Sequence, residues 1–288
     1  MSRWLRSRIR RPRVSLGLSA SGVAMTWRGA NGALAHRVAS VVIGEVPDAV
    51  VGWMKETAEL AALLAGSPVS VTLAEDLVRW WLVTAPPGAR SLAELEAFAK
   101  LRHEELFGHP ADGGTMACRW RLDGPSVCCA QAASAAKCAD TLVARLGWRL
   151  SEVSPATQRL MDIWRTKKRS AGAVVCRSAS DRAVAWWLVD GLPVELRTVR
   201  LPAENPAAAL DRELARVSSR RSEVTPGRAV VLDVISRASS PELALSGADV
   251  DRYELAALAA VKAESPAAMA AAIGAAHLEG AHELVAAR

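Results

Sequence analysis

The sequence predicts an α/β protein built from two similar lobes. Two meanders of three short β-rich runs, one near the N-terminus and one from Ala173 to Pro202, are each followed by a helical pattern. In the second meander, Asp190-Gly191 separates two apolar runs, and both residues tolerate the positive φ of a tight hairpin turn. Strands that alternate with helices in this way favour a layered α/β fold over separate all-α or all-β units. The repeated order of three strands and a helix predicts that the two lobes share one architecture.

The first lobe is expected to span residues 14–168, with an inserted subdomain. Within it, Ser91-x-x-Glu94 is a capping box that begins a helix, and Gly108 ends the helix before Pro110. The expected elements are strands at 14–18, 23–27 and 34–43, a helix at 48–65 with Asp48 as N-cap, strands at 69–73 and 77–83, the helix at 91–107, a hairpin at 116–121 and 126–130, a helix at 134–146, a strand at 148–153 and a helix from Pro155 to Trp164.

The second lobe is expected to span residues 169–288, because the polar and basic run Arg165–Ser170 separates it from the first. Its expected elements are strands at 173–176, 183–189 and 193–200, a helix from Asn205-Pro206 to about Arg220, a strand at 229–235 and a helix that begins at Ser265-Pro266. The tetrapeptide WWLV occurs at 80–83 and again at 186–189. Neighbouring Trp side chains on a strand face opposite sides, so we interpret both pairs as packing residues.

Residues 1–13 form a basic arm in which no acidic residue occurs; the first in the chain is Glu45. Its arginines are Arg3, Arg6, Arg8, Arg10, Arg11 and Arg13. Such a block is typical of a solvated arm, and two alternatives are docking on an anionic membrane surface, at about 1 kcal/mol per basic residue, and non-specific contact with nucleic acid. Basic and aromatic residues do not interleave outside the arm, so no specific nucleic-acid site is expected.

No run reaches the roughly 18 uncharged apolar residues of a membrane-spanning helix. The first residues also lack the apolar core of about 7–15 residues of a secretory signal, so a cytoplasmic protein is expected. Cys118, Cys128, Cys129 and Cys138 lack the spacing of a zinc site, and Cys128 and Cys129 should face opposite sides of a strand. They are interpreted as buried free thiols. The sequence holds no HExxH, GxSxG or Walker motif.

The two meanders resemble the phosphate-loop hairpins of the actin-like ATPase fold, a ribonuclease H-like fold. The branch they resemble is typified by the type IV pilus protein PilM and by the cytoplasmic part of the type II secretion protein GspL. The resemblance is widest in VSVTLAEDLVRWWLVTAP with ELEAFAKLRHEELFG, then in DGLPVELRTVRLP and in SPAAMAAAIGAAHL. It covers most of the chain by order of elements and implies a two-lobed actin-like fold.

Actin-like ATPases hold nucleotide with two glycine-bearing turns and with acidic residues that position Mg²⁺. The matching first turn, Ser19-Ala20-Ser21-Gly22, has no aligned acid, and residues 1–44 contain none. In the second turn, Cys176-Arg177-Ser178 stands where an Asp-x-Gly pattern is expected; Ser180 belongs to the same degenerate turn, and Asp181 is nearby but out of step. The Gly-Gly turn expected after the strand at 229–235 is absent as well. Degenerate phosphate turns are therefore predicted, with no catalytic residue, metal or cofactor.

The resemblance implies a non-catalytic cytoplasmic scaffold of a type IV pilus or type II secretion machine, peripheral to the inner membrane. Its expected partner is the cytoplasmic tail of a PilN-like or GspM-like inner-membrane protein, bound near the strand at 77–83 and the helix at 91–107. GspL-like proteins continue into a membrane helix that this sequence lacks, so a PilM-like form fits better. The alternatives are an ATPase or sugar-kinase relative that uses ATP and Mg²⁺ through unrecognised acids, and a nucleic-acid-binding protein.

Overall fold

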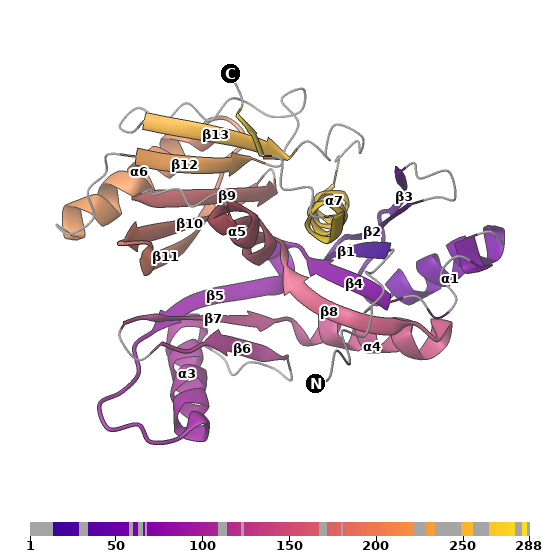
Figure 1. The fold of residues 1–288 in the computed structure, drawn as a ribbon, viewed down its shortest axis with the longest axis horizontal. Coiled ribbons are helices and arrows are strands. Elements are labelled where there is room, and N and C mark those ends of the chain that lie inside the picture. Colours follow the sequence, from indigo (N-terminus) through magenta and orange to yellow (C-terminus); the bar gives the residue numbers. More distant parts are fainter. Residues whose placement is uncertain are drawn as a thin grey trace, which may run out of the picture.

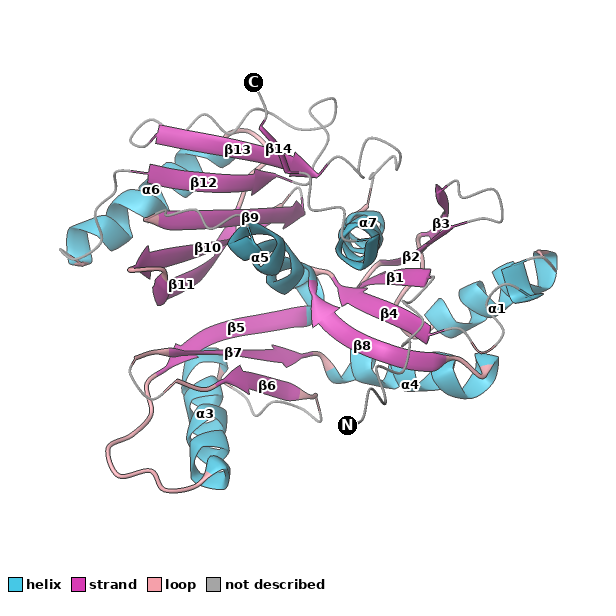
Figure 2. Ribbon diagram, in the orientation of Figure 1, coloured by secondary structure: helices cyan, strands magenta, loops and turns pink. Residues whose placement is uncertain are grey.

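The computed structural model describes residues 14–28, 34–57, 60–62, 66, 68–108, 114–121, 124–166, 172–179, 181–221, 228–233, 249–255, 265–279 and 284–286. The basic arm predicted at residues 1–13 lies outside them. Within them the chain forms three sheets with helices packed on their faces (Figures 1 and 2). None of the helices in these ranges combines the length and the apolar character that a bilayer crossing requires.

The first lobe is built on a five-stranded sheet with the strand order β3-β2-β1-β4-β8. The central strand β1 pairs antiparallel with β2 and parallel with β4, which pairs parallel with β8. Leu16 and Val71 of this sheet lie in one core cluster with Val50 of α1 and Leu142 of α4. The elements are β1 (Val14–Ser19), β2 (Gly22–Arg28), β3 (Leu34–Ala39), α1 (Val46–Glu56), β4 (Pro68–Leu73), α4 (Ala133–Leu146), β8 (Arg149–Pro155) and α5 (Ala156–Thr166).

A smaller unit is inserted between β4 and α4. It holds a short 3₁₀ helix, η1 (Glu75–Leu77), and a three-stranded antiparallel sheet with the order β5-β7-β6. Its strands are β5 (Val78–Val83), β6 (Met116–Arg119) and β7 (Ser126–Gln131), and α3 (Leu92–Phe107) covers one face. Ser91 Oγ accepts the Glu94 N–H at 3.2 Å, and Gly108 ends α3 with φ 77°. Both predicted helix caps are confirmed.

The second lobe is built on a six-stranded sheet with the order β11-β10-β9-β12-β13-β14. Asp190 and Gly191 join β10 to β11 with φ angles of 51° and 76°, as a hairpin turn with two positive φ values requires. Asn205 Oδ1 caps α6 by accepting the Ala208 N–H at 3.0 Å. The elements are β9 (Ala173–Ala179), β10 (Arg182–Val189), β11 (Leu192–Arg200), α6 (Pro206–Arg220), β12 (Arg228–Asp233), β13 (Asp249–Leu255) and β14 (Leu284–Ala286).

The last helix, α7 (Pro266–Glu279), follows the second lobe in sequence but packs on β1, β2 and β4 of the first lobe (Figure 1). The residues that face it are small. A Cβ on Gly17 would collide with the backbone of Ala267, and one on Gly274 would collide with the hydroxyls of Ser15 and Thr72. The second lobe predicted at 169–288 therefore includes a helix that packs on the sheet of the first lobe.

Two helix starts differ from the sequence prediction. Helix α1 begins at Val46 with Pro47 in its first turn, so Asp48 is not the N-cap. Asp48 instead forms an ion pair with Arg145 of α4, with an Nη1–Oδ1 distance of 2.6 Å. Pro155 was expected to begin a helix, but it is the last residue of β8, paired with Leu73. The pairing with β4 extends β8 through Pro155, so α5 begins one residue later, at Ala156.

We predict that Gly274→Ala lowers the free energy of unfolding by about 1–3 kcal/mol, because the added methyl group has no space between α7 and the sheet. Gly52→Ala is the matched control, since Gly52 is also in a helix and a Cβ there would meet nothing within 4 Å. This control should raise the free energy of unfolding by roughly 0.5–1 kcal/mol. Urea titration of both variants checks the prediction; equal effects would contradict it.

Candidate functional site

The first phosphate turn joins β1 to β2 and is held by a carboxylate from another element. Ser19 Oγ donates to the Gly22 carbonyl at 3.3 Å, while Ala20 and Ser21 are exposed. The Ala20 N–H donates to Oδ2 of Asp76 at 2.9 Å. The parallel pairing of β1 with β4 brings residues 19–20 beside residues 74–76, because the two strands end at the same edge. An acid therefore stands at this turn, although the sequence around the turn contains none.

Glu75, the neighbour of Asp76, is buried at the junction of the lobes, with only 2% of its surface exposed. Its carboxylate accepts the indole N–H of Trp80 at 2.8 Å and the backbone N–H of Thr157 at 2.9 Å. Burial raises the pKa of Glu75, and the hydrogen bonds from Thr157 and Trp80 oppose that rise. Glu75 thus links the inserted unit to the start of α5.

The second phosphate turn joins β9 to β10. Arg177 is buried in β9 at a position paired with Asp233 of β12, so it is part of the sheet and not of the turn. Asp181 is held by its neighbour Arg182, with an Oδ2–Nη2 distance of 2.7 Å. The Arg182 guanidinium lowers the pKa of Asp181. The side chain of Ser178 and the whole of Ser180 lie outside the described residues.

At both turns, a carboxylate already has a partner within the chain. At the first turn, a carboxylate already accepts the amide that would face a phosphate, and phosphate and carboxylate carry like charge. At the second turn, the nearest acid is paired with an arginine. The part of the chain that the structure describes holds no group of three or more His, Cys, Asp or Glu side chains placed for a metal ion.

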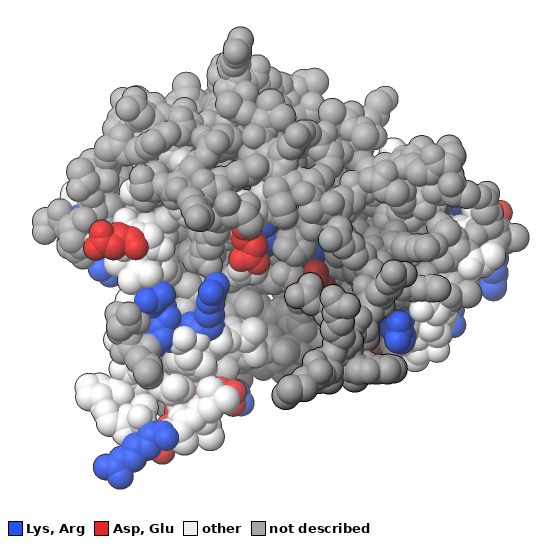
Figure 3. Space-filling view, in the orientation of Figure 1, with Lys and Arg blue, Asp and Glu red and all other residues white. Residues whose placement is uncertain are grey.

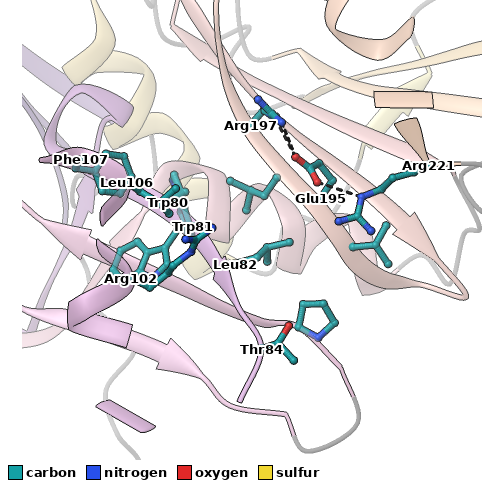
Figure 4. Close-up of a pocket in the computed structure, with 13 residues that line it drawn as sticks. Trp80, Trp81, Leu82, Thr84, Arg102, Leu106, Phe107, Glu195, Arg197 and Arg221 are labelled. Atoms are coloured by element: carbon teal, nitrogen blue, oxygen red, sulfur yellow. Dashed lines mark hydrogen bonds and ion pairs between the residues drawn. The ribbon is translucent and has the colours of Figure 1, made fainter. Parts of the chain in front are cut away.

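A second candidate site is a groove of about 470 Å³ between the inserted unit and the second lobe (Figure 4). One wall is made by β5 and α3, and the other by β11 and the end of α6. The lining residues are Trp80, Trp81, Leu82, Thr84, Arg102, Leu106, Phe107, Pro125, Val194, Glu195, Leu196, Arg197 and Arg221. This groove includes the strand and the helix near which the sequence predicted a binding site.

Both strands that flank the groove are edge strands. β5 is the last strand of the three-stranded sheet and β11 is the last strand of the six-stranded sheet, so no described strand pairs with their outer sides. The two strands contact each other. Where they meet, Trp80 of β5 packs edge-to-face against Trp186 of β10, with ring centroids 5.6 Å apart. The first Trp of each WWLV therefore joins the two units.

The charges in the groove are paired within the chain. Glu195 accepts from Arg197 at 2.9 Å and from Arg221 at 3.1 Å on the β11 wall (Figure 4). Arg102 on the α3 wall pairs with Glu105 at 2.7 Å. Figure 3 shows basic side chains at this boundary, with acidic side chains above them. The lining holds three arginines and one glutamate, and the ion pairs with Glu105 and Glu213 offset the excess positive charge.

The walls of the groove present apolar side chains. Leu106 is 47% exposed, and Leu82, Val194 and Leu196 are half-buried around the same hollow. Trp81 packs edge-to-face against His103 and Phe107 of α3, and its indole N–H is buried and not accessible from the groove. The groove therefore offers an apolar surface on which an uncharged extended segment could pack.

The structure thus brings together only part of the predicted site. Ser19 and Gly22 contact each other, and Asp181 lies at the second turn, but Arg177 is structural. Sequence reasoning missed Asp76 and Glu75. Their signal was an acidic pair directly after a buried strand, at the strand end where sites in parallel sheets gather. It also missed the β11 wall of the groove, for which the sequence contains no local signal.

Solved structures with a similar fold include three that cover most of the chain. A chain of the PilM–PilN type IV pilus biogenesis complex is 15% identical, with a TM-score of 0.64, over 94% of this chain and 100% of that one. The cytoplasmic domain of EpsL, an inner-membrane component of the type II secretion system of Vibrio cholerae, is 15% identical, with a TM-score of 0.51, over 81% and 84%. A Bacteroides thetaiotaomicron protein described as having an actin-like ATPase fold is 10% identical, with a TM-score of 0.51, over 81% and 85%.

No protein-family model and no curated protein matches the sequence. The three structures show that the chain has the actin-like fold, so the predicted fold class is confirmed. The predicted resemblance to PilM and to GspL-type cytoplasmic domains is confirmed at the level of the fold.

We predict that Glu75→Gln removes a pH-dependent part of the stability. Because burial raises the pKa of Glu75, the folded protein binds the proton of this carboxyl more tightly than the unfolded chain does. The stability gained from this proton is fully present below the ordinary Glu pKa of about 4.3, and it is lost as the pH rises through the raised value. The wild type should therefore gain stability relative to the variant as the pH falls from 8 to 4, by about 1.4 kcal/mol for each unit by which the pKa is raised.

Urea titrations at each pH give this difference, and Glu104→Gln on the exposed side of α3 is the control. A difference between wild type and Glu75→Gln that stays constant with pH would disprove the prediction.

Proposed function

We propose that this chain is a non-catalytic cytoplasmic scaffold of a type IV pilus or type II secretion machine, peripheral to the inner membrane. It binds an extended cytoplasmic tail of a PilN-like or GspM-like inner-membrane protein in the groove between β5 and β11. The observation that carries the proposal is that this groove is flanked by two edge strands and lined by exposed or half-exposed apolar side chains.

An edge strand presents unpaired N–H and C=O groups, and an extended peptide binds such an edge by adding a strand. Main-chain hydrogen bonds then provide affinity, and pockets for alternate side chains provide specificity. The apolar patch at Leu82 and Leu106 supplies such a pocket on the β5 wall, and Val194 and Leu196 supply one on the β11 wall. Because Arg102, Arg197 and Glu195 are already paired, an uncharged and mainly apolar tail fits best.

The solved structure that matches over nearly the whole chain belongs to a complex of PilM with PilN. That likeness supports a partner of the PilN type, and the likeness to EpsL supports the secretion-system alternative. The non-catalytic part of the proposal is supported by the two phosphate turns, where Asp76 and Arg182 engage the groups that a nucleotide would otherwise meet.

A second candidate function is a nucleotide-binding ATPase or sugar-kinase relative that uses ATP and Mg²⁺. The observation that favours it is Asp76 itself, a carboxylate placed at the first phosphate turn. A carboxylate in this place has two opposite uses. It repels a phosphate when it acts alone, and it helps to hold Mg²⁺ when the metal accompanies the phosphate.

We predict that a synthetic peptide of the cytoplasmic tail of the PilN-like protein of the same organism binds the full chain, and that Leu106→Arg weakens this binding at least tenfold. The reason is that Leu106 lines the groove, and a charge there must be desolvated by the bound peptide. Leu101→Arg is the matched control: Leu101 is another exposed leucine of α3, at 59% against 47% for Leu106, and it does not line the groove. Fluorescence anisotropy with labelled peptide measures the affinities.

Lack of binding by the wild type to both the PilN-like tail and a GspM-like tail would overturn the proposal. Binding that is weakened equally by Leu101→Arg and Leu106→Arg would place the tail away from this groove.

Isothermal titration with Mg-ATP separates the two candidate functions. For the scaffold, we expect no saturable binding to the wild type at micromolar concentrations, whereas Asp76→Ala, which frees the Ala20 N–H and removes a negative charge, should bind better. For the ATPase, the wild type binds and Asp76→Ala loses affinity. Tight binding by the wild type that is lost in the variant, together with release of phosphate from ATP by the wild type, would therefore remove the non-catalytic proposal.

A further inference from the structure

Cys118 of β6 and Cys128 of β7 lie directly opposite each other in the antiparallel hairpin of the inserted unit. The Gln131 N–H donates to the Thr115 carbonyl at 3.1 Å across the same pair of strands, which fixes the alternation of the ladder. Thr115 and Gln131 are a hydrogen-bonded pair, and the two kinds of pair alternate along the strands. Cys118 and Cys128 lie three positions further along, so they are a non-hydrogen-bonded pair. Such pairs have Cα atoms about 4.5 Å apart and side chains close together. A disulfide needs a Cα separation of roughly 4.4–6.8 Å.

The two thiols share one face of the sheet and differ in exposure. Cys128 is fully buried beneath α3, whereas Cys118 is half-buried on the outer strand. The thiols hydrogen-bond to each other. This hydrogen bond lowers the pKa of Cys118 and raises that of Cys128, so the accessible sulfur is also the better nucleophile.

The other cysteines do not share these features. Cys129 points to the opposite face of β7, and burial raises its pKa to about 11. Cys138 of α4 is buried and its pKa is also raised to about 11, and Cys176 of β9 is buried in the second lobe. Among the described cysteines, only Cys118 and Cys128 face each other across two strands with one thiol accessible to solvent.

We infer that Cys118 and Cys128 form an oxidation site that converts to a cross-strand disulfide under a hydroperoxide. The Cys118 thiolate attacks the peroxide, the O–O bond breaks, and a sulfenic acid and water (or an alcohol) are formed. The Cys128 thiol then attacks the sulfenic sulfur, the S–O bond breaks, and the hydroxyl leaves as water with the thiol proton. The two thiols together give up two electrons, which reduce one peroxide.

The disulfide joins β6 to β7 next to the strand that borders the groove. Trp81 of β5 is the cross-strand neighbour of Cys128 on its other side, so Trp81, Cys128 and Cys118 form one row across the sheet. Oxidation covalently closes the hairpin and removes conformational freedom from the unfolded chain. The oxidised protein is therefore more resistant to thermal unfolding than the reduced protein.

The test is peroxide treatment of the reduced full chain, followed by alkylation of free thiols and tryptic mapping without reduction. Trypsin cleaves after Arg119 and Arg121, so the two sulfurs end on separate peptides, 103–119 and 122–137, unless a disulfide links them. We expect two of the five thiols to be lost and a linked peptide pair that separates on reduction. We also expect a higher Tm for the oxidised wild type.

Because Cys128 and Cys129 lie on the same peptide, variants assign the link. The linked pair should persist in Cys129→Ser and disappear in Cys118→Ser and in Cys128→Ser, with circular dichroism as the check that each variant is folded. Three results would each overturn the inference: all five thiols of the wild type remaining free, oxidation that stops at a sulfinic acid on Cys118 without a linked pair, or a link that Cys129→Ser removes.

Discussion

The rest of the structure depends on the close approach of α7 to β1 and β4. Gly17 on the strand and Gly274 on the helix leave no room for a methyl group, and Ala271 continues the same small surface. Helix α7 is rich in alanine because it is buried between the sheet, α5 and β9, so a larger side chain would separate these layers. Helix α7, the last helix of the described residues, thereby covers β1, the first strand. The two lobes are thereby held against each other, with α7 between them.

A second contact positions the inserted unit. Trp80 packs on Trp186 of the second lobe and donates its indole N–H to the buried Glu75, which in turn accepts the backbone N–H of Thr157. A buried carboxylate is costly unless it is hydrogen-bonded, so this set of partners is favourable only in one arrangement of the three segments. Because Trp80 lies in β5 and Trp186 lies in β10, the strand next to β11, this contact holds β5 beside the second lobe. Trp80 also lines the groove, so the same contacts hold one of its walls in place.

The features that the sequence predicted correctly are those with local chemistry. The caps at Ser91 and Gly108 and the Asp190-Gly191 turn need only neighbouring residues, and each is found where it was expected. The contact of Asp76 with Ala20 could not be read in this way, because it joins residues 56 positions apart through the parallel pairing of β1 with β4. Strands β13 and β14 were missed, since four of the seven residues of β13 are charged and its apolar residues follow no strand period. The groove could not be predicted for the same reason, since its two walls are formed by β5 and β11, which lie more than a hundred residues apart.

The phosphate turns and the groove differ in how far their polar groups are already satisfied. At the first turn, a ligand must displace the Asp76 carboxylate from the Ala20 N–H, and at the second it must compete with the pairing of Asp181 to Arg182. An anionic ligand that contacts both turns must therefore compete with both of these interactions. In the groove, the charged side chains are paired with each other, but the outer backbone edges of β5 and β11 form ladder hydrogen bonds with no described strand. A peptide bound there would gain hydrogen bonds without breaking an internal one. Competition within the chain therefore supports the proposed binding of an uncharged strand at the groove rather than of a phosphate between the lobes.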